Sequence, residues 1–453
     1  MAEKKQLSLF DLSMIVVSLV IGMGIFRTPV NVAAGAQVPE LFFSAWIIGG
    51  LVALCGALTY AEIGSRFPVT GGYYKIFSAF YHPSIAFAIN CIVVVSNAAS
   101  VAGVSLIGAE YLSKIILPVE LQTEFYRIVI AAVTIFLFYL LNLFGLKVSA
   151  KTQNVLSMVK IGMVLILICA IFTGPGAASI SHSLPEFKTT TGVAPDWMDY
   201  GKALGICLIA ISFTFGGYQQ SINFGGETKE PNKVIPRAIM IGLAIIIILY
   251  MAINYAYVKV IGFEQLKTAE SIAAILAGKL FGPMGFTILS CLVYFSVLGY
   301  VNVNLLSNPR VMYAMGEEKA LPSIFSKKTA KNDVMFVSLS VFSIISIFTL
   351  FYAQTFDKIL NYTIFLDCIG MASSAATIFF LRKKTAGLDK NSIYSMKLYP
   401  LLPIIFIAAY TFVGVSIYFN DPEAGRNGLL IFAGFIVLYF VNTLVRKQQN
   451  GHN

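Results

Sequence analysis

Charged residues are scarce in this chain: Asp, Glu, Lys and Arg make up 12% of its 453 residues, whereas 57% are hydrophobic. Soluble domains carry about 25% charged residues, so the composition excludes an ordinary soluble protein. There are only three histidines, and no cluster of His, Cys and Asp has metal-ligand spacing. Nucleotide-binding and catalytic-triad motifs are also missing. We therefore expect no metal, no cofactor, no catalytic residues and no enzyme activity.

Cysteine is also rare, and none of the six lies in a predicted external loop. The positions are Cys55, Cys91, Cys169, Cys207, Cys291 and Cys368. All six fall within apolar stretches, where cysteine commonly packs as a small apolar residue. A disulfide framework is therefore not expected.

The sequence contains many long apolar stretches. About twelve are long enough to span a bilayer, whose ~30 Å core requires ~20 helical residues. We place them at 12–34, 41–62, 84–117, 128–146, 152–173, 200–224, 236–262, 283–313, 334–353, 356–381, 398–418 and 427–445. The lead MAEKKQLS enters the first run with no small-residue cleavage site after it, so no signal peptide is expected. The chain is predicted to be an all-α, multi-pass membrane protein.

The basic residues follow membrane topology. The net charge is +10, and 21 of the 32 Lys and Arg residues fall in segments assigned to the inside if the N-terminus is cytoplasmic. Nine fall outside, and the two that remain, Arg27 and Lys160, lie within spans. This bias predicts two cytoplasmic termini in a plasma-membrane protein. It also accounts for the positive charge without a nucleic-acid partner.

Glycine pairs interrupt two of the predicted spans. In VIGMGIFRTP, Val20–Pro29, the first span contains Gly22 and Gly24; in SFTFGGYQQ the sixth contains Gly216 and Gly217. Each glycine costs ~1 kcal/mol in a helix interior. Glycines that only pack helices together are the alternative interpretation. Paired breaks five spans apart instead favour a transporter built of inverted repeats, with its site near the midplane.

Unwound backbone at two such breaks has a definite chemistry. Freed amides at Gly22–Gly24, together with a helix dipole, would attract an anion. Freed carbonyls near Phe213–Gly217 would accept hydrogen bonds from a cation. A ligand with a carboxylate and an ammonium a few ångström apart fits both sites. The free α-amino acid is the simplest such zwitterion.

Four motifs in order carry a family resemblance. AEIGSRFPVTGGYYKIF, Ala61–Phe77, resembles the end of helix 2 in the amino acid–polyamine–organocation (APC) superfamily, and GMGIFRTP resembles its helix 1. Phe213–Ala238 is similar to its helix 6 and following loop, and Ser307–Pro322 to the end of its helix 8. Together they span most of residues 10–385 at fitting spacings. Bacterial relatives of the L-type amino acid transporters are most similar.

The resemblance implies a LeuT-type fold of five plus five inverted helices with two more at the C-terminus. Helices 1 and 6 would be unwound at the midplane. The implied organisation comprises a cytoplasmic N-terminus at 1–11, repeats at 12–173 and 200–382, helices 11 and 12 at 398–445, and a cytoplasmic C-terminus at 446–453. The implied activity is amino acid transport by alternating access.

Family members hold the substrate carboxylate on helix 1 amides, and the matching positions are Gly22, Met23 and Gly24. The family more often has serine or another small residue where this chain has Met23. The backbone amide of residue 23 is present with either side chain, but methionine lacks the hydroxyl that could contact the substrate carboxylate. Substrate affinity or preferred size is expected to differ accordingly.

The amino group is implied to bind carbonyls at the positions of Val20, Phe213 and Gly216. The aromatic ring at Phe213 would close over the substrate as an inner gate. Gly217 completes the second break, so we include it among the candidate substrate-binding residues.

Lys160 lies about ten residues into the fifth span, near the midplane. A charged side chain is costly at that depth and therefore indicates a functional role. Similar transporters have a lysine there in place of a sodium ion, bridging helices 1 and 8. The implied helix 8 partner is Asn304, with Asn302 as a neighbour. Snorkelling to an interface, a fixed tether and proton coupling remain open as alternatives. Substitution for sodium would make transport sodium-independent.

Arg27 lies one turn outside the first break, and Asp367 lies in the tenth span. In a LeuT-type fold these helices are neighbours at the outer vestibule. We hypothesise that the two side chains meet, directly or through water, and close the external gate. Two unrelated vestibule residues are the alternative.

Neutral substrates are expected, because the candidate polar residues of helices 3 and 6 are not acidic. These are Ser96, Asn97, Ser100, Gln219 and Gln220. Exchange and proton-coupled symport remain alternatives, as do an amino acid-sensing transceptor with little flux and a carrier of cationic amino acids or polyamines. The loop LPVELQTEFY has no cysteine, so no disulfide-linked heavy chain is expected.

Overall fold

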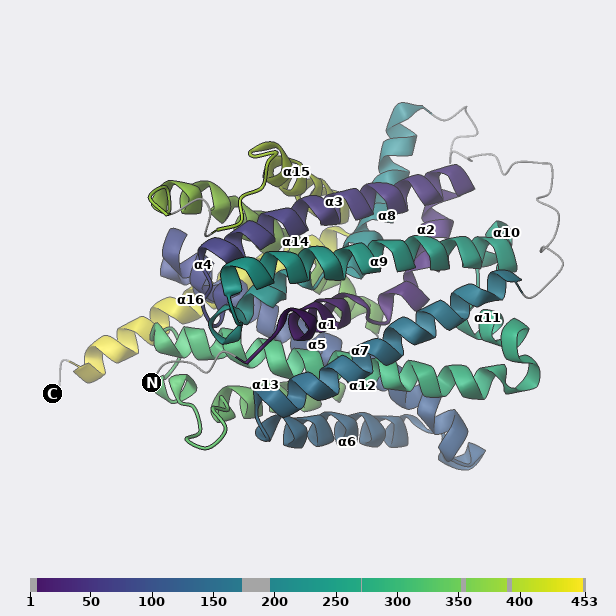
Figure 1. The fold of residues 1–453 in the computed structure, drawn as a ribbon, viewed down its shortest axis with the longest axis horizontal. Coiled ribbons are helices and arrows are strands. Elements are labelled where there is room, and N and C mark those ends of the chain that lie inside the picture. The colour runs from purple at the N-terminus through teal and green to yellow at the C-terminus, as the bar shows by residue number, and fades with distance from the viewer. Residues whose placement is uncertain (1–5, 173–195, 270, 352–355, 389–392, 451–453) are drawn as a thin grey trace.

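All regular elements in the described part of the chain are helical. The structure is a computed structural model, and it describes residues 6–172, 196–269, 271–351, 356–388 and 393–450. The long helices run side by side along the longest axis of the molecule (Figure 1). Extended backbone pairs only at two isolated bridges, Leu7–Thr228 and Thr70–Phe224, within these residues.

The helices have the following bounds. The first α-helices are α1 (Leu9–Val20), α2 (Thr28–Ala36), α3 (Pro39–Arg66), α4 (Gly72–Phe80), α5 (Pro83–Ile116), α6 (Glu124–Leu143), α7 (Leu146–Ile168) and α8 (Trp197–Phe215). The others are α9 (Pro231–Ile261), α10 (Phe263–Leu266), α11 (Ile272–Phe281), α12 (Gly285–Glu317), α13 (Phe336–Leu350), α14 (Phe356–Lys384), α15 (Leu401–Asn420) and α16 (Pro422–Asn450). Short 3-10 helices are η1 (Gly24–Phe26), η2 (Val119–Leu121), η3 (Cys169–Phe172), η4 (Tyr218–Asn223), η5 (Gly225–Glu227), η6 (Gly282–Met284) and η7 (Ser323–Ser326).

Ten helical segments of the described chain are long and apolar enough to cross a membrane. They coincide with ten of the twelve predicted spans. The other two predictions fall on shorter apolar helices, α1 and α13. A multi-pass membrane protein is thus confirmed, whereas the number twelve stays a prediction. The predicted tails fall partly on residues 1–5 and 451–453, outside the described chain, and the division into two repeats also stays a prediction.

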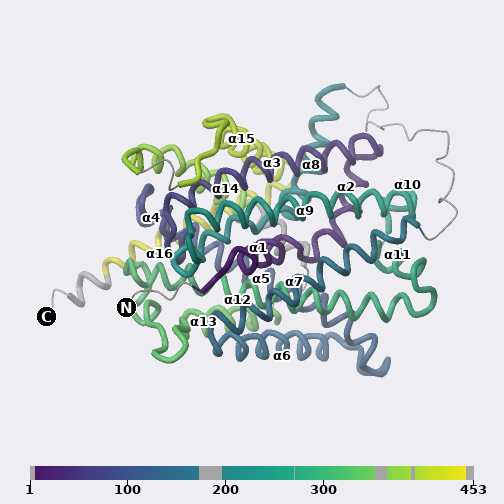
Figure 2. Tube along the Cα trace, in the orientation of Figure 1, coloured from purple at the N-terminus to yellow at the C-terminus, as the bar shows by residue number. Residues whose placement is uncertain are grey.

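Helix α1 forms the centre of the bundle. Every residue from Leu12 to Val20 is buried, as expected for a helix that is apolar on all sides. It packs against α7, α9 and α12, which surround it in Figure 2. A capping box begins the helix: the Ser8 hydroxyl accepts from the Asp11 amide at 3.3 Å, and the Asp11 carboxylate accepts from the Ser8 amide at 2.9 Å.

Both predicted helix breaks are present. Helix α1 stops at Val20 and the chain resumes as η1 and then α2, which has Pro29 in its first turn. Helix α8 stops at Phe215, and Gly217 has a φ of +117°, which glycine adopts readily. By contrast, α3, α5, α9 and α12 are long and continuous; α1 packs on α9, and α8 on α3. The broken helices are therefore held by unbroken ones.

Buried ion pairs tie together the ends of several helices. The Glu62 carboxylate accepts from Arg66 Nε at 2.6 Å and from Arg382 Nε at 2.7 Å, joining α3 to α14. Glu227 accepts from Arg310 at 2.5 and 3.1 Å, joining η5 to α12. Each of these carboxylates therefore has fixed cationic partners, as buried carboxylates generally require.

Candidate substrate-binding site

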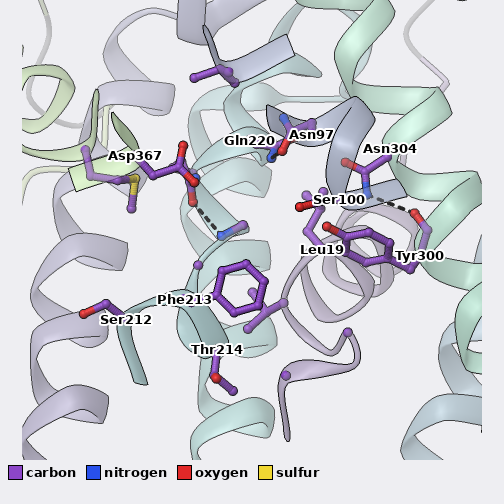
Figure 3. A pocket seen from close by; sticks show the side chains of 18 of the residues that line it. Leu19, Asn97, Ser100, Ser212, Phe213, Thr214, Gln220, Tyr300, Asn304 and Asp367 are labelled. Atoms are coloured by element: carbon purple, nitrogen blue, oxygen red, sulfur yellow. Dashed lines mark hydrogen bonds between the residues drawn. The ribbon is translucent and has the colours of Figure 1, made fainter. Parts of the chain in front are cut away.

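One cavity lies between the two breaks. All seven residues predicted to bind substrate line it, namely Val20, Gly22, Met23, Gly24, Phe213, Gly216 and Gly217. Figure 3 shows the Phe213 ring in the middle of this cavity, with Asp367 on one side and Tyr300 on the other. The cavity therefore brings together backbone from two segments almost 200 residues apart in the sequence.

The first break presents two unused backbone donors. The Gly22 amide donates to the Val20 carbonyl at 2.8 Å, so it is engaged within the break itself. The amides of Met23 and Gly24 have no acceptor among the described residues. The resemblance implied three amides for the substrate carboxylate, but the structure leaves two available. Two adjacent N–H groups at the start of a helical segment still favour an anion.

The second break approaches the first so closely that only glycine fits. A Cβ atom on Gly217 would lie 2.3 Å from the Leu19 carbonyl oxygen. The Gly217 amide donates to Gln219 Oε1 at 2.9 Å, which gives the unwound backbone a partner. The close approach of Gly217 to the Leu19 carbonyl places the end of α8 against the end of α1.

Residues whose carbonyls are candidate acceptors line the cavity from both breaks. The Val20 carbonyl already accepts from Gly22 and from the Tyr250 hydroxyl, the latter at 3.1 Å. The Phe213 carbonyl accepts from the Gly216 amide at 3.2 Å and keeps one lone pair, and the Gly216 carbonyl has no donor among the described residues. The second break therefore has the greater remaining capacity for an ammonium group.

Lys160 is fully buried and lies behind the first break, outside the residues that line the cavity. Its Nζ donates to the carbonyls of Ile21 at 2.8 Å and Ser18 at 3.3 Å. The ammonium also lies 5.9 Å from the centre of the Tyr300 ring. Helix α7 is thereby attached to the end of α1, at carbonyls that the break would otherwise leave unsatisfied.

The proposed helix 8 partner of Lys160 is engaged elsewhere in this conformation, so the bridge from Lys160 to Asn304 stays a prediction. The Asn304 amide donates to the Tyr300 carbonyl at 3.0 Å, and its oxygen accepts from Asn308 at 3.2 Å. Asn304 instead lines the cavity. Its neighbour Asn302 donates to Gln153 at 2.7 Å. Asn302 and Asn304 are two residues apart, roughly 200° around α12, so they face different helices. Residue spacing alone does not determine which of the two faces α7.

Arg27 and Asp367 are not joined in this conformation. Arg27 is exposed and Asp367 lines the cavity, with no ion pair between these two described residues. Closure of an outer gate by this pair stays a prediction for another state of the transport cycle.

Side chains from α5 and α12 complete the polar wall. Gln220 donates to Asn97 at 3.4 Å, and Asn97 donates to Asn308 at 2.7 Å. The aromatic lining, Tyr73, Tyr300 and Tyr410, was not foreseen. Tyr410 comes from α15, and hydropathy alone gives no sign that this helix reaches the cavity.

Comparisons with known proteins agree with this geometry. The sequence profile of the family described as amino acid permease matches residues 7–441. The serine/threonine exchanger SteT of Bacillus subtilis is 28% identical over 96% of this chain and 96% of its own length. The human large neutral amino acids transporter small subunit 2 is 25% identical over 97% and 81%, respectively. The human cystine/glutamate transporter is 26% identical over 97% of this chain and 85% of its own length.

Proposed function

Because this chain belongs to the amino acid permease family, we propose that it moves amino acids across the membrane by alternating access. The observation that carries this proposal is the single cavity between the two breaks. Met23 and Gly24, whose amides have no acceptor among the described residues, line the cavity from the first break, and Phe213 and Gly216, whose carbonyls can still accept, line it from the second. A free amino acid matches that arrangement through its carboxylate and ammonium groups.

The chain is a multi-pass membrane transporter rather than an enzyme. We assign it to the plasma membrane with both termini cytoplasmic, on the distribution of its basic residues. We also assign residues 12–173 and 200–382 to two inverted five-helix repeats, which the equivalent breaks in α1–α2 and α8–η4 support.

Transport is proposed to be independent of sodium. The Lys160 ammonium already binds the carbonyls of Ser18 and Ile21, where a cation would otherwise compensate the broken helix. A resident positive charge at these oxygens opposes a second one. Exchange of amino acids, with Lys160 as a fixed tether, and symport with protons, with Lys160 as the coupling site, are the two modes to be separated.

The relatives suggest several classes of substrate, because their names specify serine and threonine, large neutral amino acids, and cystine with glutamate. Neutral amino acids remain our proposal for the principal substrates. The uncharged side chains of Asn97, Ser100 and Gln220 support this proposal. Asp367 lines the same cavity and is the residue that would extend the substrate range to cationic amino acids.

Uptake into liposomes that contain the purified protein tests the proposal. Labelled amino acids are offered with and without unlabelled amino acid inside, with and without an inward proton gradient, and in sodium or choline buffer. Uptake that requires internal amino acid identifies an exchanger. Uptake driven by the proton gradient without internal amino acid identifies proton symport.

Two results would count against the proposal. A strict requirement for sodium would contradict the assignment of Lys160 to the cation position. Binding of amino acids without uptake of any of them would favour a sensor over a transporter. Empty liposomes and liposomes with heat-denatured protein supply the background.

A further inference from the structure

The substrate cavity contains one carboxylate, contributed by an unexpected helix. Of the described residues that line the cavity, only Asp367 carries a carboxylate, and none is Lys, Arg or His. Asp367 belongs to α14, whereas the polar residues considered from sequence alone lie on α5 and around the second break. In Figure 3 its carboxylate is directed toward the interior of the cavity, to one side of Phe213.

This carboxylate has no fixed partner among the residues that the structure describes. No hydrogen bond or ion pair reaches it within the part of the chain that the structure describes. Tyr73 and Tyr410 line the same cavity, yet neither hydroxyl is hydrogen-bonded to Asp367. The buried carboxylates Glu62 and Glu227, in contrast, are each held by arginine. Asp367 therefore differs from the structural carboxylates of this protein.

The nearest buried cation cannot serve as that partner in this conformation. Lys160 Nζ is committed to the carbonyls of Ser18 and Ile21, and Lys160 is not among the cavity-lining residues. An acceptor without a donor at membrane depth is costly, and such groups commonly mark a ligand pathway. A substrate group that enters the cavity can supply the missing donor.

We propose that Asp367 is a specificity-determining residue that binds a hydrogen-bond donor on the substrate side chain. This inference rests on the proposed function, because the breaks already account for the main-chain carboxylate and ammonium. Ammonium is the strongest such donor, and hydroxyl and amide groups share the chemistry. Serine and threonine therefore qualify among neutral amino acids, and ornithine and lysine among cationic ones.

Apolar side chains are disfavoured by the same geometry. An alkyl group beside Asp367 would displace water from the carboxylate without replacing its hydrogen bonds. Sites built around a polar contact discriminate strongly against analogues that lack it, because the buried polar group is left unpaired. Discrimination of about tenfold or more is expected between isosteric substrates with and without a donor.

The test measures competition for uptake by two matched pairs of amino acids in proteoliposomes. Threonine and valine differ by hydroxyl against methyl, and ornithine and norvaline differ by the terminal ammonium. The wild type should prefer threonine and ornithine. Asp367→Ala should abolish both preferences. Asp367→Asn should abolish the preference for ornithine over norvaline, because the negative charge is lost. It should retain much of the preference for threonine over valine, because an amide oxygen still accepts from a hydroxyl.

Asp421→Asn is the matched control, since Asp421 accepts from the Ala424 amide between α15 and α16 and does not line the cavity. It should leave both preferences unchanged. Size-exclusion chromatography and thermal unfolding of each variant establish that the proteins are folded. If the Asp367 variants do not fold, the wild-type preferences by themselves test the proposal.

Several results distinguish the inference from the proposed function on which it rests. Equal competition within both pairs in the wild type would overturn the role of Asp367, as would preferences that survive Asp367→Ala. Preference for threonine alone or for ornithine alone would support it and identify the donor. Failure of the wild type to transport any amino acid would instead overturn the proposed function.

Discussion

Two ionisable side chains lie at membrane depth near the cavity, and their surroundings are opposite. Lys160 is fully buried and donates to two backbone carbonyls. Asp367 lines the cavity and has no partner among the described residues. A buried charge that is hydrogen-bonded to fixed backbone groups fastens helices together, whereas a charge without such partners is available to a ligand. The local environment thus separates a tether from a recognition group, which residue type and membrane depth do not.

Removal of the tether should have the largest effect. Lys160→Ala leaves the carbonyls of Ser18 and Ile21 without a donor. Each unsatisfied carbonyl should lower the free energy of unfolding by about 1–3 kcal/mol. Transport should fall by roughly a hundredfold and the unfolding temperature should decrease. Lys151→Ala, at an exposed position on the same helix, is the control and should remain active. Near-normal uptake by Lys160→Ala would contradict a tethering role.

Both Lys160 and Asp367 act next to a cavity that exists only while the two helix breaks stay in close contact. Gly217→Ala would place a Cβ atom 2.3 Å from the Leu19 carbonyl oxygen, at a φ of +117° that alanine rarely adopts. We expect a loss of about 2–4 kcal/mol in stability, together with most of the transport activity. Thermal unfolding and uptake measure these effects.

Gly201→Ala is the matched control for that substitution. Gly201 lies in α8, and a Cβ atom there would have no neighbour within 4 Å. Helix propensity predicts unchanged or slightly increased stability, by up to about 1 kcal/mol. Equal behaviour of the two variants would show that the contact between the breaks is unimportant.

The predicted outer gate would give Asp367 a second partner in another state of the cycle. If Arg27 pairs with it there, Arg27→Ala and Asp367→Asn should each reduce transport about five- to tenfold, with membrane insertion intact. Rates of uptake at equal amounts of inserted protein test this expectation. Full activity in both variants would rule out the gate. A defect in Asp367→Asn alone would leave Asp367 with its substrate-recognition role only.

The smallest expected effect concerns the donors opposite the substrate carboxylate. Only the amides of Met23 and Gly24 are available there. Met23→Ser adds a hydroxyl and removes a flexible side chain from the cavity lining, so affinity for small substrates should rise about two- to fivefold. Met14→Leu, at a buried position on α1 that does not line the cavity, should leave affinity unchanged. A decrease in affinity would show that Met23 contributes favourable contacts.

Much of the site is predictable because its principal signals are local. Glycine pairs interrupting apolar runs correctly indicate where α1 and α8 stop, and the seven predicted binding residues all line one cavity. Lys160 also contacts the first break, although through carbonyls of Ser18 and Ile21 rather than through a bridge to Asn304. Side-chain partners across helices were less predictable than the backbone breaks.

Composition, hydropathy and glycine placement suffice for a multi-pass helical membrane protein with two unwound helices, because each depends on residues adjacent in the chain. Tertiary structure decides which side of α12 faces Lys160 and that Tyr410 of α15 reaches the cavity. It also decides that Asp367 lines the cavity with no partner from the described chain. Those outcomes depend on how helices rotate and pack against one another. Small rotations change which side chains meet while leaving the apolar pattern of every helix unchanged.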